Sequence, residues 1–539
     1  MNWTGWRARI RLLAAGAVLG ASVAVAPAVS AGTAGGHAAA AASGPVVHTG
    51  NGLVRGLADG AVDEFLGIPY ARPPVGELRW RPPQAAASWT GVRDATQFGP
   101  HCPQPPTSFG QGSTSEDCLF LNVFTPSRFR PAGQPTPAPH YPVMVWIHGG
   151  ALVTGESDDY IPAKLVQDGV TVVTINYRLG ALGFLAHPAL ADANGQSGDY
   201  GLMDQQAALR WVQHNVAAFG GNPHNVTIFG ESAGGLSTLS QVASPQARGL
   251  FDRAIVESGS YNLTQASLSS AEAAGAAFAA RAGCASQTAA CLRSLPVSAI
   301  LASENVAGYT PNINSEVLPE TLQTAFATGN FNRVPIINGT NRDEWRLFVA
   351  LSELAGNPVT AANYQNMIST TLGVSPAVAA AIAARYPLSA FPSPSIALGA
   401  VGTDAIFACP ALTIDQSVSH FVPTFGYEFN DENAPENFLP PVSFPYGAAH
   451  ASEIQYLMDL PTAAFPATLS APQQQLATIM KRYWTSFAKR GFPYSPGTPF
   501  WPLFTSRTQR MQSLSPPTPQ TETDFAGTHN CAFWTALGH

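Results

Sequence analysis

The sequence predicts an α/β fold with a central, mostly parallel β-sheet flanked by helices. Short runs rich in β-branched residues recur along the 539-residue chain with little alternation of polar and apolar positions. This pattern is typical of strands that are buried on both faces of a sheet. Stretches with helical periodicity lie between these runs, and strands that alternate with helices indicate an α/β architecture. The composition, with 45% hydrophobic and 11% charged residues, is too apolar for a disordered chain.

The expected strands combine β-branched residues with polar or turn-forming residues at their ends. They span residues 142–150, 170–178, 226–232, 253–259, 334–344 and 422–429. The expected helices carry an apolar stripe or are rich in alanine. They span residues 204–218, 271–282 and 473–490. Residues 345–410 are also rich in helix-forming residues and are a candidate cap or lid region.

The N-terminus has the features of a secretory signal peptide over residues 1–31. Three arginines precede an apolar run at 12–28, and small residues follow at 29–31. The alternative is an uncleaved membrane anchor. Residues 32–45 have the alanine- and glycine-rich composition of a flexible linker. Because no second linker follows, we expect residues 46–539 to form one domain of a secreted protein.

Charge and cysteine usage limit the partners of the chain. The net charge is −7 and no basic patch is evident among the 27 lysines and arginines, so nucleic-acid binding is not expected. No stretch after the signal approaches the roughly 20 apolar residues that span a bilayer, so no stable membrane insertion is expected after signal removal.

The six cysteines are an even number in an exported chain, which predicts disulfides in any of fifteen pairings. The chain contains no C-x-x-C spacing of the kind that would suggest a zinc or redox site. No metal or organic cofactor is expected.

The sharpest local motif is Gly230-Glu231-Ser232-Ala233-Gly234. It follows a strand-like run and precedes a helix-compatible segment. A serine nucleophile on a strained strand-to-helix turn requires this arrangement, because only small flanking residues let the turn close. The alternative is a glycine-rich helix start. The strand before the motif and the helix after it favour Ser232 as a nucleophile.

A second motif, His148-Gly149-Gly150-Ala151, ends an expected strand. Glycine permits backbone conformations that turn N–H groups into a cavity, and such loops donate hydrogen bonds to an oxyanion. The expected donors of this oxyanion hole are the amides of Gly150, Ala151 and Ala233. His148 precedes the serine, whereas this class of site runs nucleophile, acid, base along the chain. His148 is therefore expected to support the loop.

The acid and the base should follow Ser232 in the chain. Asp343 and Glu344 both follow an expected strand, where an acid would point into the site, and spacing does not separate them. Three downstream histidines are candidates for the base. His420 lies at the wrong end of a strand, and His529 adjoins Cys531 in a polar tail. His450 lies in a loop of small residues, although composition alone does not distinguish it from a surface histidine.

These residues carry a resemblance to a known family. Segments 65–76, 115–122, 176–180, 200–205, 230–235 and 483–491 resemble those of the carboxylesterase type B family, the cholinesterase-like esterases. The resemblance extends over roughly residues 46–535. It implies the α/β-hydrolase fold. One departure is Trp345, which stands where a glycine is usual.

The resemblance also implies roles for particular residues. Ser232 would be the nucleophile, Glu344 the acid and His450 the base. Glu231 would face the site, and Ser258 would be a hydroxyl near these three residues. The implied disulfides and ion pairs are Cys102–Cys118, Cys284–Cys291 and Cys409–Cys531, with Arg72–Glu116 and Arg178–Asp204.

The expected function is that of a secreted serine carboxylesterase, which hydrolyses a small-molecule carboxylic ester through an acyl-enzyme. Choline-specific relatives hold a quaternary ammonium with a tryptophan in the first disulfide loop. Here the loop between Cys102 and Cys118 contains no tryptophan, so choline esters are not expected as substrates. The alternatives are a lipase that acts on longer-chain esters and a catalytically silent binding module. The sequence does not indicate the oligomeric state.

Overall fold

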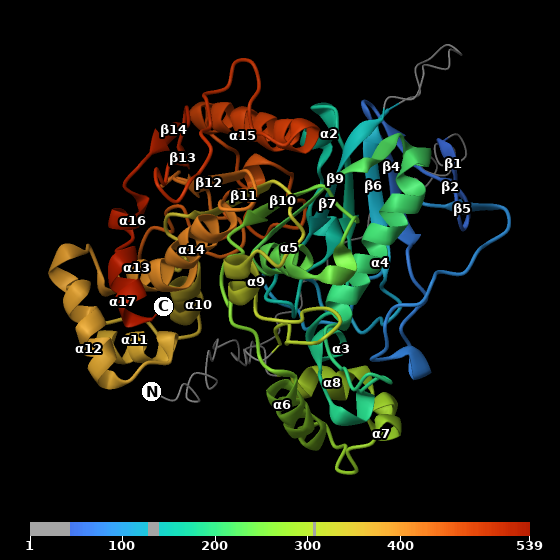
Figure 1. Cartoon of the computed structure of the whole chain (residues 1–539), viewed down its shortest axis with the longest axis horizontal. Helices are drawn as coiled ribbons and strands as arrows, with labels where there is room; N and C mark the ends of the chain where they lie inside the picture. Colours follow the sequence, from blue (N-terminus) through green and yellow to red (C-terminus); the bar gives the residue numbers. More distant parts are fainter. Residues whose placement is uncertain (1–43, 128–139, 305–308, 539) are drawn as a thin grey trace, which may run out of the picture.

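The computed structural model describes residues 44–127, 140–304 and 309–538. The expected signal peptide, residues 1–31, and nearly all of the linker at 32–45 lie outside these residues. The described chain forms an eleven-stranded sheet with the order β14-β13-β12-β11-β10-β9-β7-β8-β6-β4-β3 (Figure 1). A separate three-stranded sheet has the order β1-β2-β5.

The centre of the large sheet is parallel, as predicted. Each neighbouring pair from β8 through β7, β9, β10, β11 and β12 to β13 runs in the same direction. All five residues of Thr171–Ile175 are buried, in keeping with a strand covered on both faces. The six predicted strands are confirmed as β7 (Tyr141–Ile147), β8 (Thr171–Ile175), β9 (Gly221–Glu231), β10 (Arg253–Glu257), β11 (Ile336–Asn341) and β12 (Thr424–Phe429).

The edges of the large sheet are antiparallel. One edge is β13 with β14, and the other is β6 with β4 and β3. These are β3 (Leu57–Asp59), β4 (Val62–Pro69), β6 (Phe120–Pro126), β13 (Met511–Leu514) and β14 (Gln520–Glu522); the small sheet contains β1 (Val46–Thr49), β2 (Gly52–Arg55) and β5 (Val92–Asp94).

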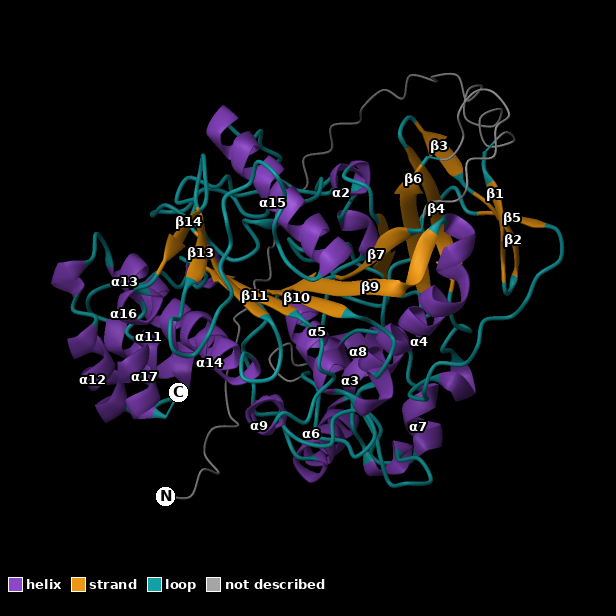
Figure 2. Cartoon of the chain, turned by 45° about the horizontal axis from the view of Figure 1, so that its top comes forward, coloured by secondary structure: helices purple, strands orange, loops and turns teal. Residues whose placement is uncertain are grey.

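Helices cover both faces of the large sheet, so it separates two apolar layers. Figure 2 shows α15 and α2 on one face and α5, α3 and α8 on the other. On the α15 side, Trp484 and Phe487 pack with Trp146 of β7 and Phe229 of β9. The predicted helices are confirmed as α4 (Tyr200–Asn215), α6 (Leu268–Arg281) and α15 (Ala471–Arg490); the others around the sheet are α2 (Ala163–Gln167), α3 (Gly180–Phe184), α5 (Ala233–Ala243), α7 (Ala289–Ser294), α8 (Val297–Ser303) and α9 (Leu322–Thr328).

A further group of helices lies beside the β13–β14 edge (Figure 1) and has its own apolar cluster. It contains α10 (Arg346–Leu354), α11 (Tyr364–Leu372), α12 (Pro376–Arg385), α13 (Pro394–Gly402), the π-helical turn η8 (Thr403–Ala408), α14 (Cys409–Val418), α16 (Phe525–Thr528) and α17 (Cys531–Leu537). Contrary to the sequence-based expectation, one stretch after the signal is apolar and long enough to cross a bilayer, the continuous helical stretch Pro394–Val418, but 78% of its most apolar window is buried in the protein. We therefore interpret it as a core helix.

Disulfides and ion pairs connect distant segments. The structure joins Cys102 to Cys118, Cys284 to Cys291 and Cys409 to Cys531. Arg178 Nε lies 2.7 Å from Oδ2 of Asp204, and both side chains are buried.

The expected pair of Arg72 with Glu116 is wrong. Arg79 is the partner of Glu116, with Nε 2.7 Å from Oε1. Arg79 is only 7% exposed, whereas Arg72 lies at the surface. The Arg79 guanidinium also donates a 2.6 Å hydrogen bond to the carbonyl of Leu295. Arg79 is therefore held both by the nearly buried Glu116 and by the segment before α8, which explains why it is the partner and Arg72 is not.

Candidate active site

Ser232 occupies a strained turn between β9 and α5. Its φ of 56° and ψ of −120° are unusual for a residue with a side chain. Its amide donates a 2.9 Å hydrogen bond to the carbonyl of Glu257 on β10. Glycines flank it because the chain packs closely: a Cβ on Gly234 would lie 1.9 Å from the carbonyl oxygen of Ile147. The turn exposes the first amides of α5, starting with Ala233, since they have no acceptor within the helix.

The His148–Ala151 loop lies directly beside this turn. A Cβ on Gly149 would be 3.2 Å from Cβ of Ser232. Gly150 and Ala151 have φ values of 98° and 55°, so the backbone turns sharply here. The amides of Val153 and Thr154 both donate 3.0 Å hydrogen bonds to the carbonyl of Gly150, which closes the turn.

His148 lies behind this loop. Its ring stacks on Tyr177 with centroids 4.5 Å apart, and its Nδ1 is 2.9 Å from the carbonyl oxygen of Gly149. Burial lowers the pKa of His148 to about 4, so the ring is neutral at pH 7. The position is that of a support for the loop.

Glu344 and His450 meet in a buried pair. Oε2 of Glu344 lies 2.5 Å from Nδ1 of His450, although 106 residues separate them in the chain. The other carboxylate oxygen of Glu344 accepts 2.7 Å hydrogen bonds from the hydroxyl of Thr340 and the amide of Asn341 at the end of β11. These bonds hold the carboxylate in one orientation.

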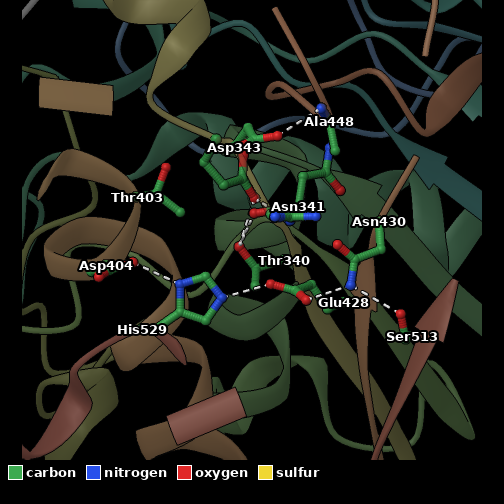
Figure 3. Close-up of polar contacts among 12 residues, drawn as sticks. Thr340, Asn341, Asp343, Thr403, Asp404, Glu428, Asn430, Ala448, Ser513 and His529 are labelled. Carbon is green, nitrogen blue, oxygen red and sulfur yellow. Dashed lines mark hydrogen bonds and ion pairs between the residues drawn. The ribbon is translucent and has the colours of Figure 1, made fainter. Parts of the chain in front are cut away.

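Asp343 points elsewhere. Its carboxylate pairs with Arg346 at 2.7 Å. It also accepts a 3.1 Å hydrogen bond from the amide of Ala448 (Figure 3). Spacing alone left Asp343 and Glu344 equivalent. The structure places Glu344 against the imidazole of His450 and Asp343 against the loop that carries His450.

His450 is surrounded by aromatic rings and carboxylates. Phe407 of η8 and Phe348 of α10 lie 5.0 and 5.3 Å from its ring centroid. Nε2 lies 3.2 Å from Oε1 of Glu231. Burial opposes protonation, but Glu231 and Glu344 raise the pKa of His450 to about 9. Burial also raises the pKa of Glu231, while the neighbouring His450 lowers it.

Ser232 and His450 are not joined by a hydrogen bond in this structure. Nε2 of His450 has no hydrogen-bond partner among the described residues. The serine hydroxyl instead interacts with Tyr261, whose pKa is raised by burial and lowered in part by this contact. Catalytic hydrogen bonds are often long in ligand-free sites and tighten when a substrate binds.

Ser258 lies just after β10. It is buried, has a φ of 49°, and donates its amide to the carbonyl of Gly339 at 3.0 Å. Its hydroxyl has no hydrogen-bond partner among the described residues.

Two further buried acids, Glu257 and Glu453, raise the pKa of Glu231. These two acids and Tyr261 were not predicted from the sequence, because nothing in their local sequence distinguishes them.

The placement of His529 in a polar tail is wrong. The residue is only 3% exposed and bridges two carboxylates (Figure 3). Nδ1 is 2.6 Å from Asp404 of η8 and Nε2 is 2.6 Å from Glu428 of β12. The Cys409–Cys531 disulfide brings this part of the chain into the core. The position of His529 next to Cys531 was the signal in the sequence that could have indicated its burial. Among the described residues, no group of three or more histidine, cysteine, aspartate or glutamate side chains could hold a metal ion.

The sheet order and the turn that carries Ser232 are those of an α/β-hydrolase. The profile of the Carboxylesterase family matches residues 43–534, and the chain belongs to this family. The protein is therefore a carboxylic ester hydrolase.

Curated relatives match over most of their length. The chain is 34% identical to the acylcarnitine hydrolase of Mus musculus, covering 87% of both chains. It is 34% identical to the para-nitrobenzyl esterase of Bacillus subtilis, covering 87% of this chain and 94% of the relative. It is 35% identical to the cocaine esterase of Homo sapiens, covering 86% of both.

Proposed function

We propose that the protein is a serine carboxylesterase that uses Ser232, His450 and Glu344. The observation that carries this proposal is the buried 2.5 Å pair of His450 and Glu344. The pair lies beside Glu231, the residue that precedes the strained serine. An imidazole held by a carboxylate on one nitrogen is oriented to accept a proton on the other.

Acyl transfer then proceeds in two halves. Ser232 leaves its contact with Tyr261, gives its proton to Nε2 of His450 and attacks the ester carbonyl. Glu344 orients the imidazole and stabilises its protonated form. The protonated His450 gives its proton to the leaving alcohol. A water molecule, deprotonated by the same imidazole, hydrolyses the acyl-enzyme.

The amides of Gly150, Ala151 and Ala233 would hold the oxyanion. A Cβ on Gly149 would lie only 3.2 Å from Cβ of Ser232, so the loop lies next to the turn that leads into α5. Backbone amides fixed before the reaction stabilise developing charge without reorganisation.

The substrate would be a small neutral ester. Tyr261, Phe348 and Phe407 form an aromatic wall at the site, with Tyr261 and Phe407 5.4 Å apart. Such a wall suits an apolar acyl or alcohol group. Three disulfides, together with the predicted N-terminal signal peptide, favour a secreted protein.

The test is hydrolysis of p-nitrophenyl esters from acetate to palmitate by the wild type and by Ser232→Ala. Ser240→Ala is a matched control, because Ser240 is a buried serine of α5, the helix that follows Ser232, and its hydroxyl bonds only to a backbone carbonyl. We expect turnover in the wild type and the control and none above background in Ser232→Ala. A preference for palmitate would indicate a lipase. No turnover by folded wild type would contradict the proposal and favour a binding module.

A further inference from the structure

The turn proposed to hold the oxyanion is not stable by itself. Ala151 and Leu152 have φ values of 55° and 61°, which are costly for residues with a side chain. Two hydrogen bonds from Val153 and Thr154 to Gly150 close the turn. Strained backbone of this kind persists only where surrounding groups hold it.

Gln104 holds the C-terminal side of this turn. Its Oε1 accepts hydrogen bonds from the Thr154 hydroxyl at 2.6 Å and the Gly155 amide at 2.7 Å. Its Nε2 donates to the Gly155 carbonyl at 3.2 Å and to Oε2 of Glu156 at 2.9 Å. A glutamine amide has two donors and two acceptor sites, and here all four are used on three consecutive residues.

Gln104 is itself fixed by the loop between Cys102 and Cys118. It is 1% exposed and exchanges two 3.0 Å backbone hydrogen bonds with Ser113 across the loop. The disulfide closes the two ends of this loop. A Cβ on Gly110 would lie 2.3 Å from the Thr154 hydroxyl and 2.6 Å from Oε1 of Gln104, so the loop packs directly against the contact.

We propose that Gln104 is a positioning residue for the reaction, which holds the Gly150–Thr154 turn so that its amides meet the developing oxyanion. Thr154 connects Gln104 to the turn. The amide of Thr154 donates to the carbonyl of Gly150, and a Cβ on Gly150 would lie 2.1 Å from the carbonyl oxygen of Thr154. The proposal rests on the proposed function. A fully satisfied buried amide specifies one arrangement of its partners.

The consequence is a selective effect on the chemical step. Amide donors act only if they lie within a few tenths of an ångström of the position the oxyanion takes. The oxyanion is absent in the ground state, so displaced donors lower kcat and leave KM nearly unchanged. A glutamine with a purely structural role would change stability without this split.

The test compares Gln104→Met, which keeps the length of the side chain but makes no amide hydrogen bonds, with Gln206→Met. Gln206 is a buried glutamine of α4 that bonds to Gln241 and Ser244, away from the turn. We expect Gln104→Met to lower kcat for p-nitrophenyl acetate by ~10- to 100-fold, with KM changed by less than about threefold. Affinity for a trifluoromethyl ketone, which forms a tetrahedral adduct with the serine, should fall by a similar factor. Gln206→Met should change neither value.

A second pair of variants keeps the proposal falsifiable if Gln104→Met does not fold. Thr154→Val removes the hydroxyl that donates a hydrogen bond to Oε1 of Gln104, and Thr154→Ser retains this hydroxyl. We expect the valine variant to lose kcat and ketone affinity together and the serine variant to recover both. Unchanged kcat in folded Gln104→Met, equal losses in Gln206→Met, or equal behaviour of the two Thr154 variants would overturn the proposal. An inactive wild type, or an active Ser232→Ala, would instead overturn the proposed function.

Discussion

Oε1 of Glu231 lies 3.2 Å from Nε2 of His450, the imidazole nitrogen that the proposed mechanism reserves for Ser232. Glu344 holds the opposite nitrogen at 2.5 Å, so two buried carboxyl groups bracket one ring. A base must be neutral to accept a proton, and both carboxylates favour its protonated form. We therefore expect the charge of Glu231 to shift the pH at which His450 could act as the proposed base.

Glu231→Gln should move the acid limb of activity to lower pH. Glu231 and Glu344 raise the pKa of His450 to about 9 against the effect of burial. Loss of one carboxylate lowers this pKa, by on the order of one unit for a neighbouring charge, so His450 is neutral at lower pH. The measurement is kcat/KM against pH for both proteins. A limb that stays in place, or moves to higher pH, would show that Glu231 does not control the base.

Glu344→Gln should reduce kcat by on the order of 10³- to 10⁴-fold, as expected when an amide replaces the carboxylate that orients the base. Asp343→Asn is the matched control, since Asp343 pairs with Arg346 and does not contact the imidazole. We expect the control to lose less than about tenfold. Steady-state kinetics at one pH separates the variants. The reverse order of losses would assign the acid to Asp343.

His529→Gln should destabilise the fold in a pH-dependent way. Burial opposes protonation, but Glu428 and Asp404 raise the pKa of His529 to about 10, above the unfolded value of about 6.5. The stabilisation is therefore complete below pH 6.5 and is lost as the pH rises through 10. Breaking a buried pair costs about 3–5 kcal/mol at low pH. Melting temperatures from pH 6 to 10 should converge for the two proteins; a constant difference would exclude a charged His529.

Arg79→Met should destabilise the protein by about 3 kcal/mol, because it leaves the nearly buried carboxylate of Glu116 without its partner. Arg72→Met should change the free energy of unfolding by less than about 0.5 kcal/mol, as is usual for an exposed side chain. Denaturant unfolding of the two variants measures both. Equal effects would be inconsistent with the assigned ion pair.

Much of the fold could be predicted from local sequence. The run at 170–178 predicted β8 because β-branched residues without alternation suit a strand covered on both faces. The helix at 473–490 was predicted from its apolar stripe and is present as α15. Strands β13 and β14, which pair antiparallel with each other at one edge of the sheet, were missed, since they are only four and three residues long. Short strands at an edge carry too few residues for a pattern to emerge.

The sequence by itself determined where the chain forms a strand, a sharp turn and a helix around Ser232, because steric limits on backbone conformation act between neighbouring residues. Only the tertiary structure showed that Glu344, the acid that the resemblance implied, contacts the imidazole, that Arg79 and not Arg72 pairs with Glu116, and that His529 is buried. Each of these outcomes depends on where a side chain points and which partner it meets. The partners lie as far as 125 residues away in the sequence, as for His529 and Asp404. Packing of the whole chain sets such directions, and no local pattern records them.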